Sequence, residues 1–236
     1  MTDTEAQVQA SQVHGSAHAR ALEHPSQRPD LLDLLARDRV LCIVRANQVA
    51  DAAGLTAALG AAGIRLVEFT FTIPGVLDVI EEAAEVPGCV VGAGTVLTAH
   101  HARDAVAAGA RFLLTPDVRP DVAAAALACG VPLVMGALTP TELSRAFELG
   151  AAAVKVFPAR IGGPAYLRDL LGPFPGARLI PTGGVNVTNA RGFLDAGALA
   201  VGAGTDVVPP SLVERGDHEG IGERAREFVR ALQPEQ

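Results

Sequence analysis

Residues 132–159 read PLVMGALTPTELSRAFELGAAAVKVFPA, and this stretch decides the fold class. Two short apolar runs, PLVMGA and AVKVFP, flank the segment PTELSRAFELG, which has helical spacing, begins at a proline and ends in glycine. Apolar runs without strict alternation are typical of parallel strands that are buried on both faces. The stretch therefore predicts a strand–helix–strand unit, and its second strand carries one charged residue, Lys155.

The same unit recurs along the chain. Further apolar runs begin at residues 41, 65, 90, 111, 178 and 200, as LCIVRA, RLVEFT, VVGAGT, RFLLTP, RLIPTGG and AVGAGT. The centres of the eight runs are about 23 residues apart, the length of a strand–loop–helix unit. Eight strands alternating with helices predict an α/β fold, a parallel (β/α)8 TIM barrel. A doubly wound open sheet is the alternative, because spacing alone does not establish closure.

The two ends of the chain carry their own predictions. DLLDLLARD, from Asp30, precedes the first strand, and we expect a helix that caps the bottom of the barrel. Residues after Pro210 are expected to form a last amphipathic helix with ERAREFVRAL as its core. Residues 1–29 are polar and alanine-rich, so we expect a mobile N-terminal extension, followed by a single barrel domain over 30–236.

The composition argues against several kinds of partner. The 236 residues include 19 basic and 26 acidic side chains, and the basic ones are not clustered, so no nucleic-acid partner is expected. The longest uncharged stretch, 122–141, is interrupted by glycine and proline, which disfavours a membrane span. Three scattered cysteines and one adjacent histidine pair predict neither a disulfide framework nor a metal site. Without an apolar signal sequence, we expect a cytoplasmic protein.

The 19 basic residues comprise 18 arginines and a single lysine, Lys155. Burial beside another cation favours the neutral amine, and a neutral amine adds to a ketone to form an imine. The alternative is a structural lysine that reaches the barrel rim or pairs with Glu68. Because arginine cannot form this imine, one lysine retained in so arginine-rich a chain favours the nucleophile.

Two further charged residues fall at the C-terminal ends of predicted strands, where such barrels place their active sites. Glu68, in VEFTFT, is a candidate general acid and base for proton transfers on a ketone adduct. Arg45, in LCIVRA, can hold a substrate carboxylate through two parallel hydrogen bonds. A counter-ion role for Glu68 and a helix-capping role for Arg45 are the alternatives.

Paired glycines follow the last two predicted strands. Gly183 and Gly184 lie in PTGGV, and Gly202 and Gly204 lie in VGAGT. Barrel enzymes commonly bind phosphate through backbone N–H groups at these two strand ends. Tight turns that require glycine are the alternative, but two glycine pairs on adjacent last strands favour a phosphate site.

Several motifs, in this order and spacing, resemble the 2-keto-3-deoxy-6-phosphogluconate (KDPG) and 4-hydroxy-2-oxoglutarate (KHG) aldolase family. They are VEFTFTIP, VGAGTV, LLTPDV, TPTEL, VKVFPA, GPFPGARLIPTGGVN and AVGAGTDVV, and the resemblance runs from about residue 30 to the C-terminus. By this resemblance, Lys155 is the Schiff-base lysine and Glu68 the acid/base. Where other members have the carboxylate-binding arginine on strand 2, this chain has Thr72, which assigns the role to Arg45. The substrate-binding residues so implied are Arg45, Thr72, Thr95, Pro116, Phe157, Gly183, Gly184, Gly204 and Thr205.

The resemblance implies a metal-independent, cofactor-free class I aldolase. Its expected reactions are cleavage of KDPG to pyruvate and glyceraldehyde 3-phosphate, and of KHG to pyruvate and glyoxylate. It also implies a homotrimer that acts in carbohydrate metabolism, in the Entner–Doudoroff pathway. The alternatives are an aldolase for the galactonate epimer, one for an unphosphorylated 4-hydroxy-2-oxo acid, or a non-catalytic barrel that binds a phosphorylated metabolite. A non-catalytic barrel would leave a buried Lys155 unexplained.

Overall fold

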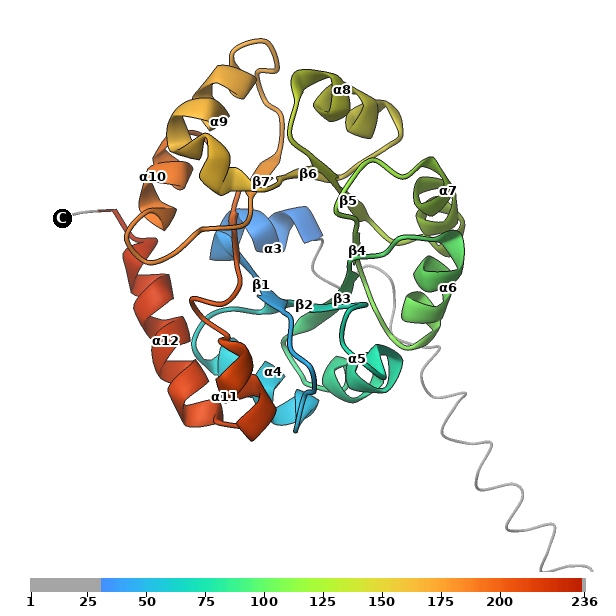
Figure 1. The fold of residues 1–236 in the computed structure, drawn as a ribbon, viewed down its shortest axis with the longest axis vertical. Coiled ribbons are helices and arrows are strands. Elements are labelled where there is room, and N and C mark those ends of the chain that lie inside the picture. Colours follow the sequence, from blue (N-terminus) through green and yellow to red (C-terminus); the bar gives the residue numbers. More distant parts are fainter. Residues whose placement is uncertain (1–30, 235–236) are drawn as a thin grey trace, which may run out of the picture. The chain divides into compact units, whose positions relative to one another are not determined.

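A computed structural model describes residues 31–234 as a parallel eight-stranded barrel surrounded by helices (Figure 1). The predicted TIM barrel is therefore confirmed, while the extension expected over residues 1–29 lies outside the described residues. The strands are β1 (Val40–Val44), β2 (Leu66–Thr70), β3 (Val90–Gly94), β4 (Leu113–Leu114), β5 (Leu133–Ala137), β6 (Ala153–Val156), β7 (Leu179–Pro181) and β8 (Val201–Ala203). The helices are α3 (Leu31–Asp38), α4 (Ala52–Ala61), α5 (Val76–Ala84), α6 (Ala99–Ala107), α7 (Pro120–Cys129), α8 (Pro140–Glu148), a 3₁₀ helix (Ala159–Ile161), α9 (Gly163–Leu171), α10 (Ala190–Asp195), α11 (Pro210–Arg215) and α12 (His218–Ala231).

The two ends of the sheet, β7 and β8, come together, which excludes the open-sheet alternative. The sheet runs in the order β7-β6-β5-β4-β3-β2-β1-β8, with all pairs parallel. An isolated parallel bridge between Thr182 and Gly202 joins the segment after β7 to β8. A Cβ atom at Gly202 would lie 2.2 Å from the Thr182 hydroxyl oxygen, so glycine permits this close approach.

Residues 132–159 fold as their sequence predicts. β5 and β6 are parallel neighbours, and α8 connects them. α8 begins with a capping box, in which the Thr139 hydroxyl accepts from the Glu142 N–H and the Glu142 carboxylate accepts from the Thr139 N–H. This local chemistry sets the start of the helix, and Gly150 follows its end with a φ of 85°.

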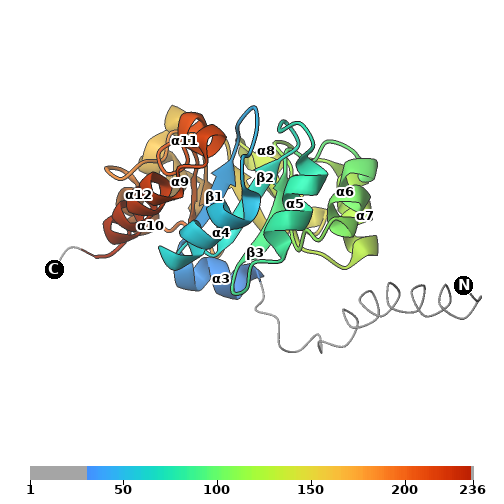
Figure 2. The ribbon, with the colours of Figure 1, turned by 90° about the horizontal axis from the view of Figure 1, so that it is seen from below.

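Helix α3 covers the barrel at the N-terminal ends of its strands, as expected (Figure 2). Its residues Leu31, Leu34 and Leu35 are buried in one apolar cluster with inward-facing side chains of the strands, including Leu41 and Leu66. A second apolar cluster lies between the strands and the surrounding helices. The bottom of the barrel is thus filled and apolar, so reactive groups are left to the opposite end.

The C-terminal region contains two helices, where the sequence predicted one. α11 is followed by its C-cap Gly216, which has a φ of 67°, a conformation that favours glycine over other residues. Asp217 is the N-cap of α12, and its carboxylate accepts the Gly220 N–H; α12 packs against α4. The amphipathic segment ERAREFVRAL lies on α12, so the prediction is correct for this helix and misses the break before it.

Candidate functional site

Lys155 and Glu68 face each other across the interior of the barrel. Along β6, Ala153 belongs to the interior cluster and Val154 to the outer one, so Lys155 points inward. The same alternation turns Glu68 of β2 inward. The Lys155 side chain is 6% exposed, that of Glu68 is fully buried, and Nζ lies 4.0 Å from Oε1. The structure thus brings the predicted amine and carboxylate together inside an apolar barrel.

The Glu68 carboxylate has no hydrogen-bond partner among the described residues. Burial raises its pKa above the ordinary value of 4.5, while the charges of Lys155 and Arg45 act in the opposite direction. A Cβ atom at Gly94 of β3 would lie 1.5 Å from Glu68 Oε1, so glycine provides the space that the carboxylate occupies. Glu68 is therefore a desolvated acid whose oxygens are free for a reacting group.

Arg45 extends from the end of β1 into a set of threonine hydroxyls. Its guanidinium donates to Thr72 Oγ1 at 3.0 Å and to Thr95 Oγ1 at 3.2 Å. The Thr72 and Thr70 hydroxyls are 2.8 Å apart, and the Thr70 hydroxyl lies within hydrogen-bond distance, 3.3 Å, of the Val44 carbonyl. The chain of bonds orients Arg45, because each hydroxyl has a defined partner. Together with Glu68 and Lys155, it makes a site with one carboxylate, one amine and one guanidinium.

Thr95 has a backbone φ of 56°, in the left-handed region that residues other than glycine rarely adopt. Such a conformation costs of order 1–3 kcal/mol and is held by the surrounding structure. Here it accompanies the hydroxyl that accepts from Arg45. The strain therefore coincides with the predicted carboxylate site.

Phe157 connects the amine to the glycine pair after β7. Its ring centroid lies 5.4 Å from Lys155 Nζ, and the residue is 40% exposed. A Cβ atom at Gly183 would lie 3.0 Å from the same ring. Gly183 and Gly184 both have a φ of 86°, so these positions need glycine for their conformation as well.

The loops after β7 and β8 are tied together. The Asp206 carboxylate accepts the Val187 N–H at 3.1 Å, and the Arg224 guanidinium donates to the Asp206 carbonyl at 3.1 Å. Gly204 is half-buried and Thr205 is exposed in the turn that follows. With the bridge between Thr182 and Gly202, these bonds place both predicted phosphate-binding segments at one end of neighbouring strands.

Pro116 lies two residues after the end of β4, and its carbonyl packs against β5. A Cβ atom at Gly136 would lie 2.1 Å from the Pro116 oxygen, so glycine at this position admits the loop. The Thr115 hydroxyl donates to the Asp117 carbonyl at 2.6 Å and fixes the same turn. Contacts of Pro116 are thus with β5, which neighbours the strand of Lys155.

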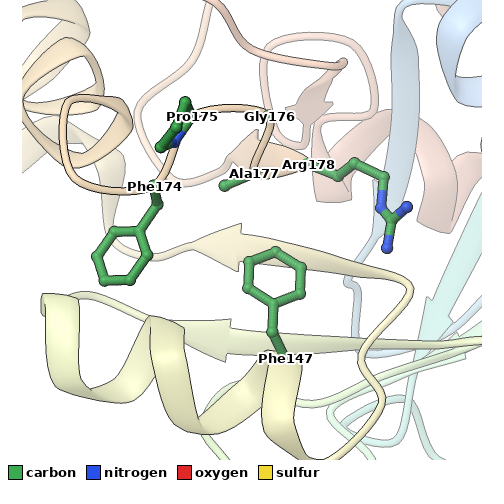
Figure 3. Close-up of a pocket in the computed structure, with 6 residues that line it drawn as sticks. All are labelled: Phe147, Phe174, Pro175, Gly176, Ala177 and Arg178. Atoms are coloured by element: carbon green, nitrogen blue, oxygen red, sulfur yellow. The ribbon is translucent and has the colours of Figure 1, made fainter.

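A pocket of about 280 Å³ lies elsewhere, between the end of α8 and the loop before β7 (Figure 3). In Figure 3, Phe174 extends from the loop before β7 and Phe147 from α8. The lining residues of the pocket precede β6 and β7, so the pocket is at the N-terminal ends of the strands, opposite Lys155. The segment GPFPGAR, most of which lines this pocket, therefore lies away from the site that contains Lys155. The pocket is lined by Phe147, Phe174, Pro175, Gly176, Ala177 and Arg178.

Thr70 shares the inward face with Glu68 and Thr72, because they follow each other at every second position. Gly94 is a residue of the site that the sequence does not predict. Gly94 becomes recognisable only through the pairing of β2 with β3, in which it lies beside Thr70. No local pattern in VVGAGT distinguishes it from a turn glycine.

None of the helices within residues 31–234 is long and apolar enough to cross a membrane. Within the same part of the chain, no group of three or more His, Cys, Asp or Glu side chains is arranged to hold a metal ion.

Comparison with known proteins gives concordant matches. Residues 32–224 match the family model described as KDPG and KHG aldolase. The 2-dehydro-3-deoxy-phosphogluconate aldolase of Treponema pallidum is 36% identical over 196 residues, or 81% of this chain and 92% of that protein. The KHG/KDPG aldolase of Escherichia coli K12 is 33% identical over 198 residues, covering 83% of this chain and 93% of its own. A structure of KDPG aldolase from Legionella pneumophila, with pyruvate captured at low pH as a covalent carbinolamine intermediate, has a TM-score of 0.77 at 31% identity. It covers 84% of this chain and 97% of that one.

Proposed function

Since this chain belongs to the KDPG and KHG aldolase family, we propose that it cleaves KDPG to pyruvate and glyceraldehyde 3-phosphate. KHG, which would give pyruvate and glyoxylate, is its second substrate. The buried pair of Lys155 and Glu68, with 4.0 Å between Nζ and Oε1, is the observation that carries the proposal. Lys155 is the single lysine of the sequence, and the Glu68 carboxylate beside it has no hydrogen-bond partner among the described residues.

In this mechanism Arg45 binds the substrate carboxylate through its guanidinium, which Thr72 and Thr95 orient. Carboxylate binding presents the C2 ketone to Lys155. The neutral amine adds to C2 to give a carbinolamine, and Glu68 relays protons through a water molecule as the hydroxyl leaves. The apolar walls of the barrel favour this step, because they keep the amine from bulk water.

The iminium then acts as the electron sink for cleavage of the C3–C4 bond. Glu68 accepts the proton of the C4 hydroxyl, and glyceraldehyde 3-phosphate leaves as the aldehyde. The remaining enamine takes a proton at C3 to become the pyruvyl imine, which water hydrolyses to release pyruvate and free Lys155. Glu68 later returns each proton that it accepts, so this one carboxylate serves as both acid and base.

The substrate phosphate is assigned to the loops after β7 and β8, with Gly183, Gly184, Gly204 and Thr205 as its contacts. The bond from the Val187 N–H to the Asp206 carboxylate supports this assignment, since it holds the two loops side by side, and Arg224 of α12 fixes the Asp206 backbone. A homotrimer, a cytoplasmic location and a role in the Entner–Doudoroff pathway are part of the same proposal and come from the family resemblance alone.

Borohydride reduction in the presence of pyruvate tests the imine. We expect one reduced pyruvyl adduct per chain by intact mass, and digestion should place it on the peptide that contains Lys155. Lys155→Arg, which keeps the charge and cannot form the imine, should give no adduct and no KDPG cleavage. Absence of the adduct in the unaltered protein, or continued cleavage by Lys155→Ala, would contradict the mechanism.

A further inference from the structure

Arg160 lies beside the glycine pair that follows β7. It belongs to the 3₁₀ helix after β6, and its backbone N–H donates to the Gly183 carbonyl at 3.0 Å. A Cβ atom at Gly184 would lie 2.7 Å from Arg160 Cβ and 3.4 Å from Nε. The arginine stem therefore runs along the face of Gly184, where any larger residue would displace it.

The guanidinium of Arg160 has no hydrogen bond and no ion pair within residues 31–234. The residue is exposed, so its charge is available to a ligand. By contrast, Arg191 of α10 and Arg224 of α12 are both engaged, Arg191 with Asp195 and Arg224 with the Asp206 carbonyl. Among these arginines, Arg160 is the one whose position and free donors fit an incoming anion.

The backbone around Arg160 presents donors instead of acceptors. The Gly183 carbonyl is occupied by the Arg160 N–H, and the Gly184 carbonyl accepts from the Asn189 side-chain amide at 2.9 Å. The Gly184 N–H donates to no atom of the described residues. Since carbonyl oxygens repel an anion and N–H groups attract it, this local pairing favours an anion next to the guanidinium.

A sequence of contacts leads from the reactive amine to Arg160. Lys155 Nζ lies near the Phe157 ring, the ring borders Gly183, and Gly184 borders Arg160. A substrate whose ketone carbon is bonded to Lys155 and whose chain follows this direction brings its far end to the guanidinium. In KDPG, that far end is the phosphate.

We propose that Arg160 determines selectivity for substrates with a terminal phosphate, by donating to the phosphate beside the Gly184 N–H. This inference rests on the proposed aldolase function and adds a charged side chain to a site otherwise made of backbone groups and one hydroxyl. A guanidinium suits the task because it stays protonated and presents several donors in one plane.

The test compares kcat/KM for KDPG with kcat/KM for KHG, which lacks the phosphate. In Arg160→Gln, the ratio of the two should fall by about 10- to 100-fold, as expected for loss of a charge-assisted hydrogen bond. Most of the change should appear in KM for KDPG, and Arg160→Lys should recover part of it. An unchanged ratio, or an equal loss with both substrates, would overturn the inference.

Arg103→Gln is the matched control, because Arg103 is also exposed and lies on α6, on a different side of the barrel (Figure 1). It removes the same charge and should leave the ratio unchanged. Titration with inorganic phosphate provides a readout that is independent of turnover, and Arg160→Gln should bind it more weakly than either Arg103→Gln or the unaltered protein. If pyruvate trapping fails, the proposed function is wrong, and this titration still decides the role of Arg160; equal phosphate binding by both variants would overturn it.

Discussion

The Glu68 carboxyl group occupies a position where an ionised carboxylate is costly. It is fully buried, has no hydrogen-bond partner among the described residues, and has Lys155 Nζ 4.0 Å away. The barrel therefore holds an acid that folding disfavours in its charged form. Retaining this side chain is understandable if its proton is needed for chemistry, because an apolar residue would pack there at lower cost.

A pH-dependent stability difference follows from the raised pKa of Glu68. Burial lifts this pKa above 4.5, so the stabilisation of the protonated acid is full below 4.5 and is lost as pH rises through the folded-state value. Glu68→Gln stays neutral, so the free energy of unfolding of the variant minus that of the unaltered protein should grow as pH increases from 4.5. Urea denaturation at a series of pH values measures it.

Glu81→Gln is the control for this measurement. Glu81 lies exposed on α5, and its substitution removes the same charge. Its difference in unfolding free energy from the unaltered protein should vary much less with pH. If the Glu68→Gln difference were flat or shrank as pH rises, the carboxyl group would be stabilised in its charged form by Lys155 and Arg45, contrary to what its burial implies.

At the scale of the element, helix α3 serves as the floor of the barrel. The strands enclose an apolar interior that water would otherwise reach from below, and three leucines of α3 fill that end. The reactive side chains lie toward the other end of the same strands. Stability and chemistry are therefore assigned to opposite ends of one interior, as is usual in barrels of this kind.

Leu35→Ala should destabilise the protein without altering the chemistry. Leu35 is fully buried in the interior cluster, and loss of a buried leucine costs about 2–5 kcal/mol of unfolding free energy. Urea denaturation measures the loss, and the pyruvate trap on the remaining folded protein should be unchanged. Leu127→Ala is the matched control, because Leu127 is 83% exposed on α7 and should cost far less. Equal losses for the two variants would show that α3 does not contribute to the core.

At the scale of the whole molecule, the repeat of apolar runs was sufficient to predict the barrel, because each run is buried on both faces and each linker is long enough for one helix. Closure was not predictable, since it depends on a bridge between Thr182 and Gly202 that spacing cannot reveal. The sequence predicted a single helix after Pro210 because the amphipathic pattern is otherwise continuous there, so the break at Gly216, before α12, was missed. Arg160 escaped notice because its significance comes from Gly184, a contact across two strand ends.

Chelation should leave the activity of the whole enzyme intact. In the proposed mechanism the iminium on Lys155 supplies the electrophile that a divalent cation would supply in a metal-dependent aldolase. KDPG cleavage after dialysis against EDTA should therefore match the untreated rate, and added Mg²⁺ or Zn²⁺ should not raise it. Activity that is lost on chelation and restored by a divalent cation would refute the imine as the sole electron sink.

Lys155, the single lysine among 19 basic residues, also makes the protein spectroscopically simple. Protein grown with lysine that carries ¹⁵N at the side-chain nitrogen would contain one labelled side chain, and it is the one that points into the barrel. Its resonance would report protonation, imine formation and hydrolysis directly, free of overlap from surface amines. The arginine-rich composition thus turns the reacting atom into the only signal of its kind in the spectrum.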